Sequence, residues 1–145
     1  MIEVKNVTLE TFRILHSEII EYYQCIEHDM RRIYSIMCVD DYKECMDNLR
    51  EKNWNVVLKE LKKLDNDNGD PYFSDDDYDL LDEIRTRRNY WCHQCYLDWV
   101  YIQDSGQRNQ RLQRLTRQLE NEHNRAYKLH KKMQDHVMEV YNEFE

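Results

Sequence analysis

Hydrophobic side chains recur at steps of three and four along most of the chain, the spacing that places them on one face of an α-helix. The first series follows Thr8, a residue type that caps helix N-termini. Its members are Phe12, Leu15, Ile19, Tyr22, Ile26, Met30, Ile33 and Met37. This spacing predicts one long amphipathic helix near the start of the chain.

A second helical segment is expected after Asp40 or Asp41, running to about Leu64. Its apolar positions are Tyr42, Met46, Leu49, Trp54, Val57, Leu58, Leu61 and Leu64. A break near Asn53 would divide this segment into two helices. The next ten residues, DNDNGDPYFS (65–74), include Gly69 and Pro71 and predict a turn exposed to solvent.

Two further helices are predicted in the second half of the chain. One begins at Ser74, whose hydroxyl can cap it, and carries three aspartates (75–77) that complement its N-terminal amides. It is expected to run to DSGQ (104–107), with a stripe of Leu81, Ile84, Arg88, Trp91, Cys95, Trp99 and Ile102. The last helix has a nearly heptad series: Leu112, Leu115, Leu119, Glu122, Ala126, Leu129, Met133, His136, Val140 and Phe144. We expect this series to pack against the first helix, with a partner helix as the alternative.

Composition supports an all-helical fold. The 145 residues include two glycines and one proline, too few for the many tight turns of a sheet protein of this size. We therefore expect a single all-α domain over residues 1–145, an up-and-down bundle of four helices, or five if the second is broken.

Charge and cysteine content indicate the cellular environment and the class of partner. No apolar run approaches the roughly 20 residues that span a bilayer, and the N-terminus resembles no secretion signal. Five cysteines with one close pair indicate a reducing, cytoplasmic environment rather than a disulfide framework. The net charge of −8 opposes a polyanionic partner, but residues 107–134 hold eight basic and two acidic side chains. A polyanion could contact that basic segment.

The stretch RRNYWCHQC (87–95) concentrates polar and reactive side chains inside a predicted helix. Cys92, His93 and Cys95 are zinc-ligand types, but a closed zinc site needs four ligands and the other cysteines are scattered. A redox pair usually lies at a helix N-terminus, whereas these cysteines lie well inside the helix. Asp65, Asp67 and Gly69 also miss the spacing of a calcium loop. We expect no metal and no cofactor.

Arg88, Asn89 and His93 remain as candidates for a site. Arg88 falls on the apolar stripe, where burying a charge destabilises the fold by roughly several kcal/mol unless the charge is paired or faces a polar cavity. Asn89 and His93 are four residues apart, so the amide could bond one imidazole nitrogen. Arg88 and His93 are separated by about 140° around an ideal helix. Two copies packed about a two-fold axis could bring them to one groove.

The sequence RNYWCH resembles the Arg-x(4–6)-His motif of the HEPN superfamily, in which asparagine often follows the arginine. The resemblance covers six residues, in a helical setting compatible with most of the chain. It implies a HEPN-like metal-independent endoribonuclease, typically dimeric and often a toxin or antiviral defence effector. It assigns catalytic roles to Arg88 and His93 and a supporting role to Asn89. The partners it implies are RNA, a second copy of the chain, and an antitoxin or regulatory protein, with no membrane.

The chemistry of RNA suits these side chains. The ribose 2′-hydroxyl is the nucleophile, His93 would transfer protons near neutral pH, and Arg88 would hold the phosphate. Arg85 and Arg87 could position the RNA backbone. The alternative is a non-catalytic helical interaction or nucleotide-binding module, in which the same side chains pin an interface or bind phosphate. An Arg88 sealed in a salt bridge would favour that alternative.

Overall fold

The computed structural model describes residues 6–37, 42–50, 52–67 and 69–144, and these contain helices and turns but no strand. The five helices are α1 (Leu9–Met37), α2 (Tyr42–Arg50), α3 (Trp54–Asp67), α4 (Asp75–His93) and α5 (Ser105–Phe144). The predicted all-α bundle is confirmed, in its five-helix form. Asp40, Asp41 and the side chains of Tyr42 and Phe144 lie outside the described part of the chain.

Helix α1 begins where its cap predicts. The Thr11 amide donates to the Thr8 hydroxyl at 3.1 Å, and the Thr8 amide donates to the Thr11 hydroxyl at 2.9 Å. The two threonines therefore satisfy each other's amides at the helix start. Tyr23, rather than Tyr22, lies in the centre of the predicted apolar face, and Met37 at its end is only partly buried. The buried residues of this face are Phe12, Leu15, Ile19, Tyr23, Ile26, Met30 and Ile33.

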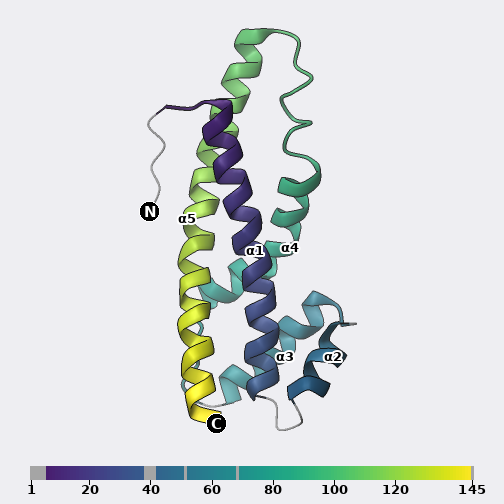
Figure 1. Cartoon of the computed structure of the whole chain (residues 1–145), viewed down its shortest axis with the longest axis vertical. Coiled ribbons are helices and arrows are strands. Elements are labelled where there is room, and N and C mark those ends of the chain that lie inside the picture. Colours follow the sequence, from purple (N-terminus) through teal and green to yellow (C-terminus); the bar gives the residue numbers. More distant parts are fainter. Residues whose placement is uncertain (1–5, 38–41, 51, 68, 145) are drawn as a thin grey trace.

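Helices α1 and α5 make the most extensive helix–helix contact of the bundle and run in the same direction (Figure 1). Glu18 of α1 faces His123 of α5, and Tyr22 contacts Tyr127 and His130 farther along. The predicted packing of the last helix against the first is confirmed. Most positions of the heptad-like series are buried: Leu112, Leu115, Leu119, Ala126, Leu129, Met133, His136 and Val140. Glu122 is only partly buried, and Thr116, His123 and Val137 are buried although they lie outside the series.

The predicted break near Asn53 separates α2 from α3. The Asn53 side chain accepts a hydrogen bond from the Asn55 amide at 3.1 Å, so it caps the start of α3. Trp54 follows and is buried, and its indole N–H donates to the Leu81 carbonyl of α4 at 2.9 Å. Asn53 and Trp54 therefore fix where the chain meets α4.

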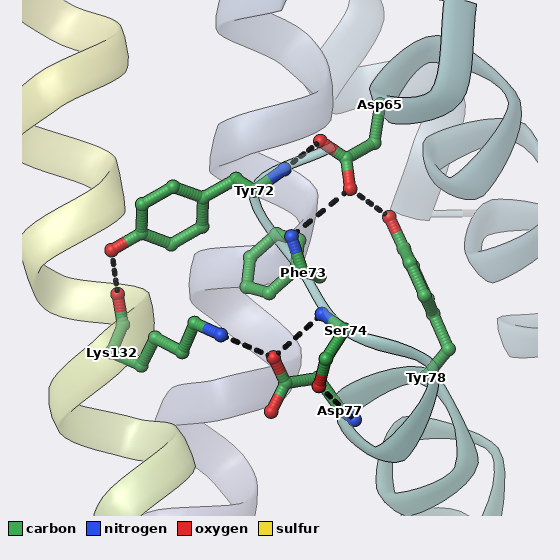
Figure 2. Close-up of polar contacts among 7 residues, drawn as sticks. All are labelled: Asp65, Tyr72, Phe73, Ser74, Asp77, Tyr78 and Lys132. Carbon is green, nitrogen blue, oxygen red and sulfur yellow. Dashed lines mark hydrogen bonds and ion pairs between the residues drawn. The ribbon is translucent and has the colours of Figure 1, made fainter. Parts of the chain in front are cut away.

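Asp65, near the end of α3, binds the segment that leads into α4. Asp65 is 3% exposed, and its carboxylate accepts hydrogen bonds from the Tyr72 and Phe73 amides and the Tyr78 hydroxyl (Figure 2). The prediction of a turn exposed to solvent was wrong for this residue. The buried carboxylate is stable because three donors replace water.

Ser74 and Asp77 form the predicted start of α4, and they also attach it to α5. Each side chain accepts a hydrogen bond from the other residue's amide, at 2.9 and 3.1 Å. Lys132 of α5 donates to the Asp77 carboxylate at 2.5 Å (Figure 2). Burial alone would raise the pKa of Asp77, but the bonds from Lys132 and Ser74 hold it below its ordinary value.

Helix α4 ends at His93, about eleven residues earlier than predicted from DSGQ (104–107). The amides of Gln94 and Cys95 both donate to the Tyr90 carbonyl, at 2.9 and 3.0 Å. The second bond spans five residues, which widens the last turn. Residues 94–101 form turns that still bury Cys95 and Trp99, so the apolar spacing continues although the helix does not.

Candidate anion-binding and catalytic site

Arg88 points from α4 toward α1, where it pairs with Glu27. Its Nη1 lies 2.5 Å from Glu27 Oε2, and the two side chains are 29% and 17% exposed. The expectation that an arginine on this stripe must be paired or face a polar cavity is confirmed, and both conditions hold. The pair is not sealed, because both of its side chains also line a cavity.

A cavity of about 150 Å³ opens beside this pair, between α1, α3 and α4. Four of its lining side chains are cationic and one is a carboxylate. The lining residues are Glu27, Arg31, Lys52, Asn53, Trp54, Arg85 and Arg88. In a chain of net charge −8, this local excess of positive charge favours an anion.

Among the described residues, each of the other cations in the cavity contacts one neighbour. Arg85 Nη1 donates to Asn53 Oδ1 at 3.1 Å, and Arg31 donates to the Leu49 carbonyl. Lys52 lies 3.5 Å from the Glu60 carboxylate, with both side chains well exposed. A guanidinium carries five N–H donors, so these single contacts orient the arginines and leave donors for a ligand.

Glu27 is the least satisfied group of the cavity. Its Oε1 is buried and has no hydrogen-bond partner among the described residues. Burial raises the pKa of Glu27 above its ordinary value, although Arg88, Arg31 and Arg85 act in the opposite direction. The carboxylate therefore holds Arg88 in place through one oxygen only.

Arg87, the other predicted RNA-binding residue besides Arg85, has a different environment. Its Nε and Nη2 donate to the two Glu122 oxygens at 2.5 and 2.7 Å. The guanidinium also lies over the rings of Tyr90 and Trp91, at 4.8 and 5.7 Å from their centroids. Contact with RNA would require Arg87 to leave this network, so Arg85 is the better placed of the two.

His93 lies in the last turn of α4 and is exposed, as is Asn89 one turn earlier. No hydrogen bond joins these two side chains within the described structure, so Asn89 does not orient the imidazole in the single chain. Five residues of helix separate His93 from Arg88, a rise of about 7.5 Å. The single chain thus places the arginine in the cavity and the histidine outside it.

A second histidine, His16 of α1, contacts the end of α4, and no sequence pattern pointed to it. His16 Nε2 of α1 is 2.6 Å from the Trp91 carbonyl, and its ring packs against Phe12 and Tyr96. It satisfies a carbonyl of the last helical turn, one of the groups that lack an intrahelical partner. This contact joins α1 to the last turn of α4, two residues before His93.

The cysteines of the motif face apart. Cys92 is exposed, while Cys95 is 1% exposed and donates to the Trp91 carbonyl. Burial raises the pKa of the Cys95 thiol to about 11, so it stays protonated at neutral pH. Across the described residues, no three His, Cys, Asp or Glu side chains are placed to hold a metal ion.

The sequence did not single out Glu27, Arg31 or Lys52, which complete the cavity. Glu27 and Arg31 are four residues apart on α1, a spacing common on solvated helix faces, and so carry no distinctive signal. The basic series of α5 (Arg108, Arg111, Arg114, Arg117, Arg125, Lys128, Lys131 and Lys132) contributes none of the described cavity lining.

Comparisons with known proteins place no family name on this arrangement. No family model, curated protein or solved structure matches the chain. Within the described residues, every helix is too short or too polar to cross a bilayer.

Proposed function

We propose that the protein is a metal-independent endoribonuclease that acts as a dimer, as its HEPN-like motif implies. The supporting observation is that Arg88 lines a cationic cavity while His93 is exposed on the same helix, about one and a half turns away. A second copy could place its His93 near the Arg88 cavity of the first. The site would then be completed only between two chains.

Cleavage requires two proton transfers and stabilisation of negative charge. The ribose 2′-oxygen attacks phosphorus as one His93 accepts the hydroxyl proton, and a protonated His93 of the other chain gives a proton to the departing 5′-oxygen. The products are a 2′,3′-cyclic phosphate and a 5′-hydroxyl. Arg88 holds the phosphate oxygens through its remaining N–H donors and stabilises the added charge. Arg85 directs the neighbouring backbone.

The test is RNA cleavage by purified protein in EDTA. A proton-transfer histidine contributes about 10²–10⁴-fold, so His93→Ala should lower the rate at least ~100-fold. His28→Ala is the matched control, because His28 is also an exposed helical histidine but lies outside the motif. Arg88→Gln should also lose cleavage, and circular dichroism should show that each variant remains helical. Wild-type rates in the folded His93→Ala variant would exclude this mechanism.

One observation favours a second candidate function. Arg88 already has an ionic partner in Glu27, and His93 does not share its cavity. These features suit a phosphate- or nucleotide-binding module without catalysis. In that case wild-type protein would bind RNA or nucleotide but leave RNA intact, and His93→Ala would bind with unchanged affinity.

A further inference from the structure

We propose that the Arg88 cavity binds a terminal phosphate, a phosphomonoester at the end of an RNA chain, more tightly than the internal phosphodiester that it must also hold for cleavage. The proposal rests on the proposed function only in taking RNA as the carrier. The phosphate site itself is argued from the size, charge and donors of the cavity.

Size limits what the cavity accepts. Pockets that hold drug-sized ligands measure about 300–1,000 Å³, whereas this one measures about 150 Å³. At roughly 30 Å³ for each water, it has room for about five waters. A phosphate group fits this space, but a whole nucleotide does not. The nucleoside of a bound ligand must therefore remain outside the cavity.

Charge selects among phosphates. Arg31, Lys52, Arg85 and Arg88 line the cavity with one carboxylate, Glu27, and Lys52 also lies 3.5 Å from the Glu60 carboxylate outside it. A phosphomonoester carries about −1.5 to −2 charges at neutral pH, whereas a phosphodiester carries one. Against Glu27 and Glu60, two cationic charges remain in excess, and the monoester matches them better than the diester does.

The donors come from three separate parts of the chain. Arg31 belongs to α1, Lys52 lies just before α3, and Arg85 and Arg88 lie on one face of α4, three residues apart. Because they surround the cavity, they can address several oxygens of one group at once. A terminal phosphate offers three free oxygens, whereas an internal phosphodiester offers two and must leave the cavity on both sides.

Glu27 competes with the ligand. It occupies one edge of Arg88 and places a negative charge beside the incoming phosphate. A neutral amide at this position would keep a hydrogen-bond acceptor for Arg88 and remove the repulsion. Glu27→Gln should therefore tighten phosphate binding, whereas loss of a lining cation should weaken it.

The experiment is isothermal titration of a 5′-phosphorylated hexaribonucleotide and its 5′-hydroxyl counterpart, with inorganic phosphate as a third probe. His93→Ala protein is used so that cleavage does not interfere, and failure of the nuclease proposal leaves this result interpretable. We expect the 5′-phosphorylated RNA to bind at least ~10-fold more tightly, because its terminal phosphate adds charge-assisted hydrogen bonds that the 5′-hydroxyl oligonucleotide cannot make. Inorganic phosphate should compete with it.

Matched variants assign the effect to the cavity. Lys52→Met and Arg85→Gln should each reduce the preference for the phosphorylated end, and Glu27→Gln should increase it. Lys59→Met and Arg114→Gln are the controls, because both residues are exposed and lie outside the cavity. Equal affinity for the two oligonucleotides, or equal losses in the cavity and control variants, would overturn the proposal. Competition by inorganic phosphate without any preference for the phosphorylated end would exclude RNA ends as the ligand.

Discussion

Arg87 and Arg88 are consecutive residues, yet their carboxylate partners differ in how many oxygens accept a hydrogen bond. Arg87 faces α5, where both oxygens of Glu122 accept from its guanidinium and one also accepts from the Trp91 indole at 3.3 Å. Arg88 faces α1, where only one oxygen of Glu27 has a partner among the described residues and a cavity opens alongside. In the Arg87 region both carboxylate oxygens are occupied, whereas the Arg88 region leaves one buried oxygen without a partner beside a cavity.

The difference shows how one helix can serve both stability and binding. Successive residues are about 100° apart on a helix, so adjacent arginines face different neighbours. A charge pair whose carboxylate oxygens are both occupied contributes to the fold, whereas a pair that leaves a buried oxygen without a partner is more costly to bury. This contrast distinguishes Arg88 from Arg87 as the residue suited to hold a phosphate.

Removing the charge of Glu122 or of Glu27 should reveal the largest difference in stability between the two regions. Glu122→Gln should lower the free energy of unfolding by about 2 kcal/mol, because it leaves a half-buried Arg87 without its charged partner. Glu27→Gln should change it by less than about 1 kcal/mol, because that pair is incomplete and costly to desolvate. Urea denaturation followed by circular dichroism measures both. Equal losses would show that the two regions are energetically alike.

Local signals explain which parts of the fold could be predicted from sequence. The spacing of Leu119, Ala126 and Met133 predicts their burial because helical periodicity depends on the chain alone. Ser74 likewise predicts the start of α4 through a contact three residues away. The end of α4 was missed because the following turns continue to bury Cys95 and Trp99.

The site was only partly predictable, because its groups meet through tertiary structure. The position of Arg88 on an apolar stripe indicates that it needs a partner or a polar cavity. Its partner, Glu27, lies 61 residues away, and no local pattern specifies that pairing. The same holds for Asp65, whose neighbouring Asp67 and Gly69 suggest a solvated turn although its carboxylate is buried.

Replacing each arginine by lysine should also distinguish the two regions, with a smaller loss of stability. Lysine keeps the charge but loses the planar fork and the stacking. Arg87→Lys should cost about 1–1.5 kcal/mol of stability, because Arg87 makes two parallel bonds to Glu122 and lies over two rings. Arg88→Lys should cost about half as much, because it replaces one bond to Glu27. Thermal unfolding of the two variants beside wild type measures this order, and a reversed order would contradict the assignment of the more fully bonded carboxylate to Arg87.

The smallest expected effect is a pH dependence of stability that arises from Glu27, the partner of Arg88. Because burial raises the pKa of Glu27, the folded state holds its proton more tightly than the unfolded state does. The resulting stabilisation is present below the ordinary pKa of 4.5 and is lost as pH rises through the folded value. Unfolding in phosphate-free buffers from pH 4 to 7 should therefore show wild type losing stability relative to Glu27→Gln as pH increases.

Asp77 provides the opposite sign within the same protein. Its pKa is held below the ordinary 3.8 by Lys132 and Ser74, so its contribution is present above that value and is lost as pH falls through the folded pKa. Wild type should lose stability relative to Asp77→Asn only on acidification below pH 3.8. If Glu27 also followed that direction, its pair with Arg88 would outweigh its burial, and that pair would resemble the pair of Arg87 and Glu122.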